Sequence, residues 1–180
     1  MLATGVTAAS GFGFWLICSR LFTPADIGTA TTLISATLVI SYVSLLGFNS
    51  TFVRFLPTST DRDSEITTGL LLSMAGAIVL GALYVVAIPL LAPTITIFHE
   101  HVGYALAFIV IAACSALNLL TDSIFVALRA AKYNLIIDGL VLGACKLLLP
   151  VVLLGSGAFG VYVASGAGTL VAMPLSIYVL

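Results

Sequence analysis

Six long apolar runs, separated by short polar segments, restrict this chain to one class of fold. About 20 consecutive apolar residues cross a bilayer as a helix. The 180 residues include only six Lys or Arg and seven Asp or Glu, and the mean hydropathy is +1.26. So few polar side chains cannot cover the exterior of a water-soluble domain of this size. The sequence therefore predicts an all-α, polytopic membrane protein.

Residues 1–180 are expected to form a single transmembrane helical bundle joined by turns. The breaks fall where proline, glycine or charge interrupts the apolar runs, as in the TPAD segment 23–26 and the polar run 57–65. The six predicted transmembrane helices are residues 2–22, 27–56, 66–92, 102–128, 134–154 and 157–180.

The basic residues predict how this bundle is oriented. Loops rich in Lys and Arg stay on the cytoplasmic side of a membrane. Among the predicted loops, the first, third and fifth hold only Arg20, whereas the second and fourth hold Arg54, Arg62, Arg129 and Lys132. We therefore expect a multi-pass protein of the cell membrane with a cytoplasmic N-terminus. The formal net charge of −1 offers no basic face for nucleic acid.

Small residues at four-residue spacing predict where the helices touch. Without a hydrophobic driving force in lipid, helices associate through close backbone packing at Gly, Ala and Ser. Gly139 and Gly143 form one such pair, and Gly160, Ala164 and Gly168 form a longer stripe. If the chain forms one lobe of a larger bundle, this stripe is expected to lie against lipid when the other lobe is missing.

Lys146 is the first candidate functional residue, because it lies near the middle of predicted span 134–154. A lysine at the centre of a membrane helix costs about 2.5–3.5 kcal/mol on insertion scales, so it is expected to meet a wet cavity or an anion. The alternative is a long side chain that reaches a membrane interface.

Asp122, Asp138 and Asn118 form a second group of candidates. With the fourth predicted helix running inward and the fifth outward, both carboxylates lie at a similar depth, and Asn118 lies one turn from Asp122. Two carboxylates in a low dielectric can share a proton or hold a cation, which predicts ion coupling or a cavity lining. Alternatively, each carboxylate bonds to the adjacent loop or pairs with Arg129 or Lys132.

Arg20 and Arg54 are the remaining candidates, either as anchors at helix ends or as ligands of an anion. Two histidines at positions 99 and 101 lack a third ligand, so no metal is expected. Phosphate-cradling loops and nucleophile elbows are absent from the sequence. An enzyme is therefore not expected, and neither is a cofactor.

The order of several short motifs resembles one transporter family. The segment 19–28 (SRLFTPADIG) is similar to the end of the first helix in polysaccharide flippases of the multidrug/oligosaccharidyl-lipid/polysaccharide superfamily, which is also called MATE-like. Further similarity lies in residues 46–48 (LGF), 52–57 (FVRFLP), 127–130 (ALRA), Asn134 and 157–160 (GAFG). Together these motifs extend over essentially the whole chain.

This resemblance implies a transporter with two six-helix lobes around a central cavity that opens alternately to each side. The substrate would be a lipid-linked oligosaccharide or polysaccharide precursor, and the partners would be membrane lipid and that lipid-linked sugar. Lys146, with Arg20 and Arg54, would contact the anionic headgroup. Asp122 and Asp138 would serve ion coupling.

The chain departs from that family by having six predicted spans, which make only the N-terminal lobe. We therefore expect either a missing C-terminal lobe or a second copy as a further partner. Two other functions stay open: a drug or organic-cation antiporter of the same superfamily, which acidic residues would favour, and a non-transporting membrane assembly subunit.

Overall fold

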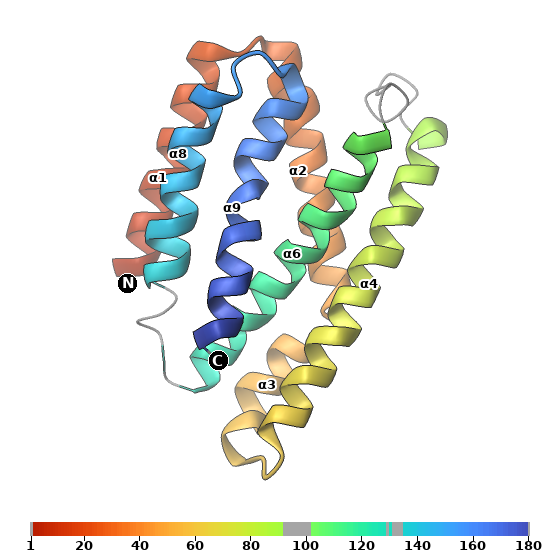
Figure 1. Ribbon diagram of the computed structural model, residues 1–180, viewed down its shortest axis with the longest axis vertical. Helices are drawn as coiled ribbons and strands as arrows, with labels where there is room; N and C mark the ends of the chain where they lie inside the picture. The colour runs from red at the N-terminus through yellow and green to blue at the C-terminus, as the bar shows by residue number, and fades with distance from the viewer. Residues whose placement is uncertain (1, 92–101, 129, 131–134, 180) are drawn as a thin grey trace. The chain divides into compact units, whose positions relative to one another are not determined.

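The computed structural model describes residues 2–91, 102–128, 130 and 135–179. Its regular elements in these residues are all helical. The chain divides into two compact units: the first comprises Met1–Ala36 and Ala131–Leu180, and the second comprises Thr37–Ala130. Figure 1 shows the helices in chain order, from red to blue.

Within the described residues, four helices are long and apolar enough to cross a membrane, as in a membrane protein. They are α2 (Pro24–Ser44), α6 (Val102–Ala127), α9 (Gly157–Val179) and the part of α4 (Arg62–Leu91) up to Pro89. Each overlaps one of the predicted spans. The two others, 2–22 and 134–154, correspond to α1 (Leu2–Leu21) and to a shorter apolar helix over Gly139–Val152, and as membrane crossings they stay predictions. The single bundle of six spans likewise stays a prediction.

The first unit is built on α1, η2 (Leu135–Leu142), α8 (Gly143–Val152) and α9, together with the first half of α2. Within this unit α8 contacts both α1 and α9, and Figure 1 shows α1 and α8 side by side. Small residues allow the close approach. A Cβ on Gly143 would lie 3.3 Å from Ser10, and one on Gly168 would lie 3.2 Å from Cys145.

The small-residue stripe on α9 serves this internal packing. Gly160, Ala164 and Gly168 are all buried, and Gly168 faces Leu142 and Cys145. The expectation that the stripe would lie against lipid was therefore wrong. The expectation that four-residue spacing marks a helix contact is confirmed for Gly168, because backbone packing needs residues without a large side chain.

The N-terminus of α2 is closed by a side-chain cap. Pro24 is the first helical residue, and its fixed φ and missing N–H suit that position. Thr23 precedes it and accepts a hydrogen bond from the Asp26 N–H at 3.2 Å. The Thr23 hydroxyl in turn donates to the Asp26 carboxylate at 2.6 Å. This arrangement satisfies one N–H that the helix itself leaves without a partner.

The second unit contains the rest of α2, α3 (Phe48–Phe55), η1 (Leu56–Thr58), α4 and α6. Helices α4 and α6 pack antiparallel: Gly81 lies near Ile109, and Ala77 packs against Ala113 and Ala116. Small residues again face each other at this contact.

The predicted span 27–56 is interrupted in the structure. Helix α2 ends at Ser44, Leu46 and Gly47 adopt positive φ angles of 50° and 86°, and α3 follows. Glycine populates this backbone region without steric cost, which allows the turn. Helix α3 is amphipathic. Phe52 packs with Leu120 and Ile124 of α6, and the exposed side carries polar groups including Arg54.

Helix α4 begins at Arg62, four residues before the predicted start at Ile66. Asp63 and Glu65 lie in its first turn, where carboxylates favour the positive end of the helix dipole. The Glu65 N–H donates to the Asp61 carbonyl at 3.2 Å. Hydropathy did not indicate this turn because its residues are polar, although their charges are typical of a helix start.

Candidate functional site

Lys146 lies in α8, the helix of the first unit that packs between α1 and α9. Its side chain is half-buried. Residues three or four positions apart share one face of a helix. Lys146 therefore shares a face with Gly143 and Pro150, which are both buried. Gly143 packs on Ser10 of α1, so this face is directed into the first unit.

The opposite face of α8 is apolar and exposed. Leu148 is 66% exposed and Val151 is 52% exposed. On a helical wheel both lie more than a third of a turn from Lys146, on the far side of the helix axis. A helix of this composition in a membrane would present Leu148 and Val151 to lipid. The cation thus belongs to the side of α8 that other helices of the unit cover.

The segment just before α8 has an unusual backbone. Residues Leu135–Leu142 form a π-helix, η2, which contacts α1, α8 and α9. π-Helical turns are rare and occur frequently at functional sites. Sequence reasoning missed this feature, and the nearest signal was the pair Gly139 and Gly143, both of which are buried. The backbone of Asp138 belongs to η2, but its side chain is outside the described part of the structure.

Arg20 lies in the same unit as Lys146 but not at the same level. The contacts of Gly143 with Ser10 and of Leu147 with Gly13 show that α1 and α8 run parallel. By this register Lys146 lies level with residues 12–13, so Arg20 is about 11 Å further along the helix axis. Arg20 is exposed in the last turn of α1. That position suits a cation at the negative end of the helix dipole.

Arg54 belongs to the second unit. It is exposed on α3, and its guanidinium carbon lies 5.2 Å from the centroid of the Phe55 ring. Such a cation–π contact holds an arginine at an aromatic surface. Nearby, Arg62 donates a hydrogen bond to the Pro57 carbonyl at 2.8 Å. Lys146 and Arg20, both in the first unit, therefore do not lie at one site. Arg54 belongs to α3 of the second unit.

Asn118 and Asp122 lie one turn apart on α6 of the second unit. Asn118 is buried and Asp122 is half-buried. On the helical wheel they lie opposite Ala113 and Ala116, the residues that pack on α4. Thr121 lies between these two residues in the sequence. Its hydroxyl donates to the Asn118 backbone carbonyl at 2.9 Å, so the Thr121 side chain is bonded to the backbone of its own helix. The expected shared face of Asn118 and Asp122 is present.

The described residues contain no group of three or more His, Cys, Asp or Glu that could hold a metal ion. The His99–His101 segment lies outside them. Cys18 is buried, and Cys114 and Cys145 are partly buried, each as a free thiol. Cys145 packs beside Gly168, a close contact that a small, soft side chain suits.

The chain matches no family model, and comparison with curated proteins and with solved structures likewise gives no match.

Proposed function

We propose that this chain is one lobe of a transporter that moves a lipid-linked oligosaccharide or polysaccharide precursor across the cell membrane by alternating access. In this proposal the N-terminus lies in the cytoplasm, and a second lobe or a second copy completes the cavity. The observation that carries the proposal is the position of Lys146 on the buried face of α8, opposite the exposed Leu148 and Val151.

The energetic argument concerns the cost of that lysine. A cation near the centre of a membrane helix costs about 2.5–3.5 kcal/mol, and an apolar residue there would avoid this cost. A lysine directed toward the lipid chains would form no interaction that offsets this cost. A lysine on the covered face can meet an anionic ligand, and a lipid-linked diphosphate supplies that charge. Ammonium groups bind phosphate as point charges.

The motifs that resemble polysaccharide flippases support the same substrate class. They include residues 19–28 at the junction of α1 and α2 and residues 157–160 at the start of α9. The resemblance rests on the order of these short motifs. In the proposed site, Lys146 binds the headgroup. Arg20 lies about 11 Å from it along the helix axis and contacts the headgroup only at an earlier or later stage of passage.

A second candidate function is antiport of an organic cation, and α6 carries the observation that favours it. Asp122 is half-buried one turn from buried Asn118, away from the α4 contact. A carboxylate in such surroundings can bind a cation or a proton. The two candidates differ in the charge of the ligand, so binding experiments separate them.

The test measures ligand binding and flipping by the chain reconstituted in nanodiscs and vesicles. We expect a fluorescent polyprenyl-diphosphate sugar to bind the wild type, and Lys146→Ala to weaken binding at least tenfold, as the loss of a charged hydrogen bond of about 1.5–3 kcal/mol implies. Lys146→Arg keeps the positive charge and should retain most of the affinity.

The matched control is Arg20→Ala, which removes an exposed cation from the same unit. It should change binding far less than Lys146→Ala. An unchanged affinity and flipping rate in Lys146→Ala would exclude the headgroup assignment. Binding of a lipophilic cation that is lost in Asp122→Asn would replace the first proposal with the second.

A further inference from the structure

The buried hydroxyl groups of the first unit lie on the two helices that flank Lys146. Among the described residues of this unit, the buried serine and threonine side chains are Ser10 on α1 and Thr169 and Ser176 on α9. Ser165, one turn before Thr169 on α9, is half-buried. Both α1 and α9 contact α8, the helix that carries the lysine.

Two of these hydroxyls lie on α9 close to the level of Lys146. Helix α9 folds back on α8, so the two helices run antiparallel. A Cβ on Gly168 would lie 3.2 Å from Cys145, which makes these two residues level with each other. By this register Lys146 lies between the levels of Ser165 and Thr169, and each is about 3 Å from it along the helix axis.

Ser10 lies at a similar level on α1. A Cβ on Gly143 would lie 3.3 Å from the Ser10 Oγ, so Ser10 is level with Gly143, about 4.5 Å from Lys146 along the axis. A long side chain on a helix points toward the N-terminus of that helix. The Lys146 side chain therefore extends toward the levels of Ser10 and Thr169.

Lys146 is directed between α1 and α9. Cys145 packs beside Gly168 of α9, and the Leu147 side chain packs beside Gly13 of α1. Successive residues on a helix are about 100° apart, so Lys146 lies between these two contacts on the helical wheel of α8. Its ammonium group therefore extends into the angle between the two helices that carry the hydroxyls.

Each of the three hydroxyls near this level donates to a backbone carbonyl of its own helix. These hydrogen bonds join Ser10 Oγ to the Thr7 carbonyl at 3.0 Å, Ser165 Oγ to the Tyr162 carbonyl at 2.7 Å, and Thr169 Oγ1 to the Gly166 carbonyl at 2.6 Å. A hydroxyl has one donor and two acceptor lone pairs. The three oxygens therefore present acceptors to their surroundings, and their only donors are already used.

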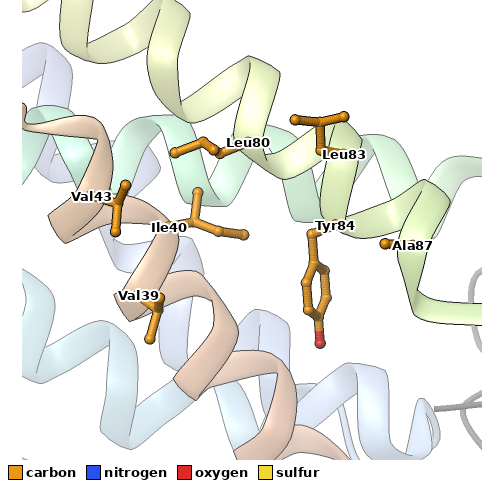
Figure 2. A pocket seen from close by; sticks show the side chains of 7 residues that line it. All are labelled: Val39, Ile40, Val43, Leu80, Leu83, Tyr84 and Ala87. Carbon is orange, nitrogen blue, oxygen red and sulfur yellow. The ribbon is translucent and has the colours of Figure 1, made fainter. Parts of the chain in front are cut away.

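The groove between α2 and α4 in the second unit has a different chemistry. Figure 2 shows its seven lining side chains, among which the Tyr84 hydroxyl is the one polar side-chain atom. Such a lining offers few hydrogen bonds to a polar ligand. Recognition of hydroxyl groups on a ligand is therefore better suited to the polar side chains around Lys146 in the first unit.

We propose that Ser10, Ser165 and Thr169 bind hydroxyl groups of the sugar that follows the diphosphate, while Lys146 binds the diphosphate. This assignment rests on the proposed transport function and makes the three side chains specificity-determining residues of that site. A sugar hydroxyl can donate to an oxygen whose own hydrogen is already used, whereas a phosphate oxygen only accepts. The first sugar is bonded directly to the diphosphate, so one site holds both groups.

The test compares two ligands on the full chain in nanodiscs. Both are polyprenyl diphosphates with a fluorophore on the prenyl chain, and only one carries the sugar. The wild type should bind the sugar-bearing ligand more tightly. Thr169→Val removes one hydroxyl and keeps the shape of the side chain. It should weaken binding of the sugar-bearing ligand about fivefold, the usual contribution of one hydrogen bond, and leave the sugar-free ligand unchanged.

Ser10→Ala and Ser165→Ala should have the same selective effect, and they keep the test usable if Thr169→Val does not fold. The matched controls are Ser19→Ala and Thr31→Val. Ser19 and Thr31 belong to the same unit and are exposed, and their hydroxyls also donate to carbonyls of their own helices, at 2.9 Å and 2.7 Å. Both controls should leave the binding of either ligand unchanged.

Three results would overturn the assignment. Equal affinity of the wild type for the two ligands would exclude recognition of the sugar. Equal weakening of both ligands by Thr169→Val would make the hydroxyls positioning residues of Lys146. Unchanged binding in all three variants would mean that the hydroxyls serve only their own helices. Failure of the proposed transport function gives a different result, because then neither ligand binds the wild type or Lys146→Ala changes the binding of neither.

Discussion

At the scale of single residues, Thr23 and Asp26 of the first unit are joined by two hydrogen bonds at the start of α2. Thr23 both accepts from the Asp26 N–H and donates to the Asp26 carboxylate. The same carboxylate lies beside the start of α9, because a Cβ on Gly157 would be 3.4 Å from its Oδ1. Since helix N-termini favour negative charge, Asp26 serves the starts of two helices.

We predict that Thr23→Ala lowers the free energy of unfolding by about 1 kcal/mol, the usual cost of removing an N-cap side chain. The measurement is denaturant unfolding in detergent, followed by the fluorescence of Trp15. The control is Thr31→Ala in the same helix, where the hydroxyl only donates to the Ile27 carbonyl at 2.7 Å. Equal effects of both substitutions would argue against the cap.

The position of Lys146 could be predicted only in part from the sequence. Hydropathy identified a lysine inside an apolar run, which is visible without any structure. The face of α8 that it occupies was not predictable, because it depends on which neighbours bury Gly143 and Pro150. For the same reason the sequence grouped Arg20 with Lys146, although the register of α1 against α8 separates them by about 11 Å.

At the scale of elements, the turn between α8 and α9 depends on the absence of a side chain at Gly160. A Cβ there would lie 2.8 Å from the Leu153 carbonyl oxygen, which is backbone and cannot rotate away. The turn also contains Gly157 with a φ of 53°, in the left-handed region. Together these glycines allow α9 to fold back on α8.

We predict that Gly160→Ala destabilises the chain by about 1–3 kcal/mol, as expected for overpacking at a rigid contact. Gly28→Ala is the matched control, because a Cβ at Gly28 in α2 meets nothing within 4 Å. That substitution should be neutral or slightly stabilising, since alanine favours a helix over glycine. The unfolding experiment used for Thr23 measures both. Similar losses in the two variants would contradict the packing account.

The ends of most elements could be predicted from the sequence, because apolar runs stop at proline, glycine and charge. Helix α6, over Val102–Ala127, differs from its predicted span by one residue. Two features were not predictable. The turn at Leu46–Gly47 occurs inside a run that reads as one helix, and the π-helix η2 has the composition of an ordinary apolar helix. Both depend on packing, which hydropathy does not report.

At the scale of the whole molecule, the prediction of an all-helical fold is confirmed for the residues that the structure describes, and four of their helices are long and apolar enough to cross a membrane. The crossings by α1 and by the η2–α8 segment stay predictions, as do orientation and transport. Orientation depends on the membrane and on the charge of the loops.

We predict that the polar segment between α3 and α4 lies in the cytoplasm, because the basic residues Arg54 and Arg62 flank it. A Thr60→Cys variant in a background without native cysteines should react with a membrane-impermeant maleimide in inverted vesicles but not in intact cells. Thr60 is exposed, so access is not limited by burial. Reaction in intact cells would reverse the predicted orientation.

The central claim is that Lys146 meets a polar ligand space and not lipid. The most direct measurement is the reaction of Lys146→Cys with a water-soluble, charged thiosulfonate in membrane vesicles, after Cys18, Cys114 and Cys145 have been replaced by alanine. Leu148→Cys, on the exposed face of the same helix, is the comparison. We predict rapid labelling at position 146 and none at position 148. No labelling at either position would contradict the account.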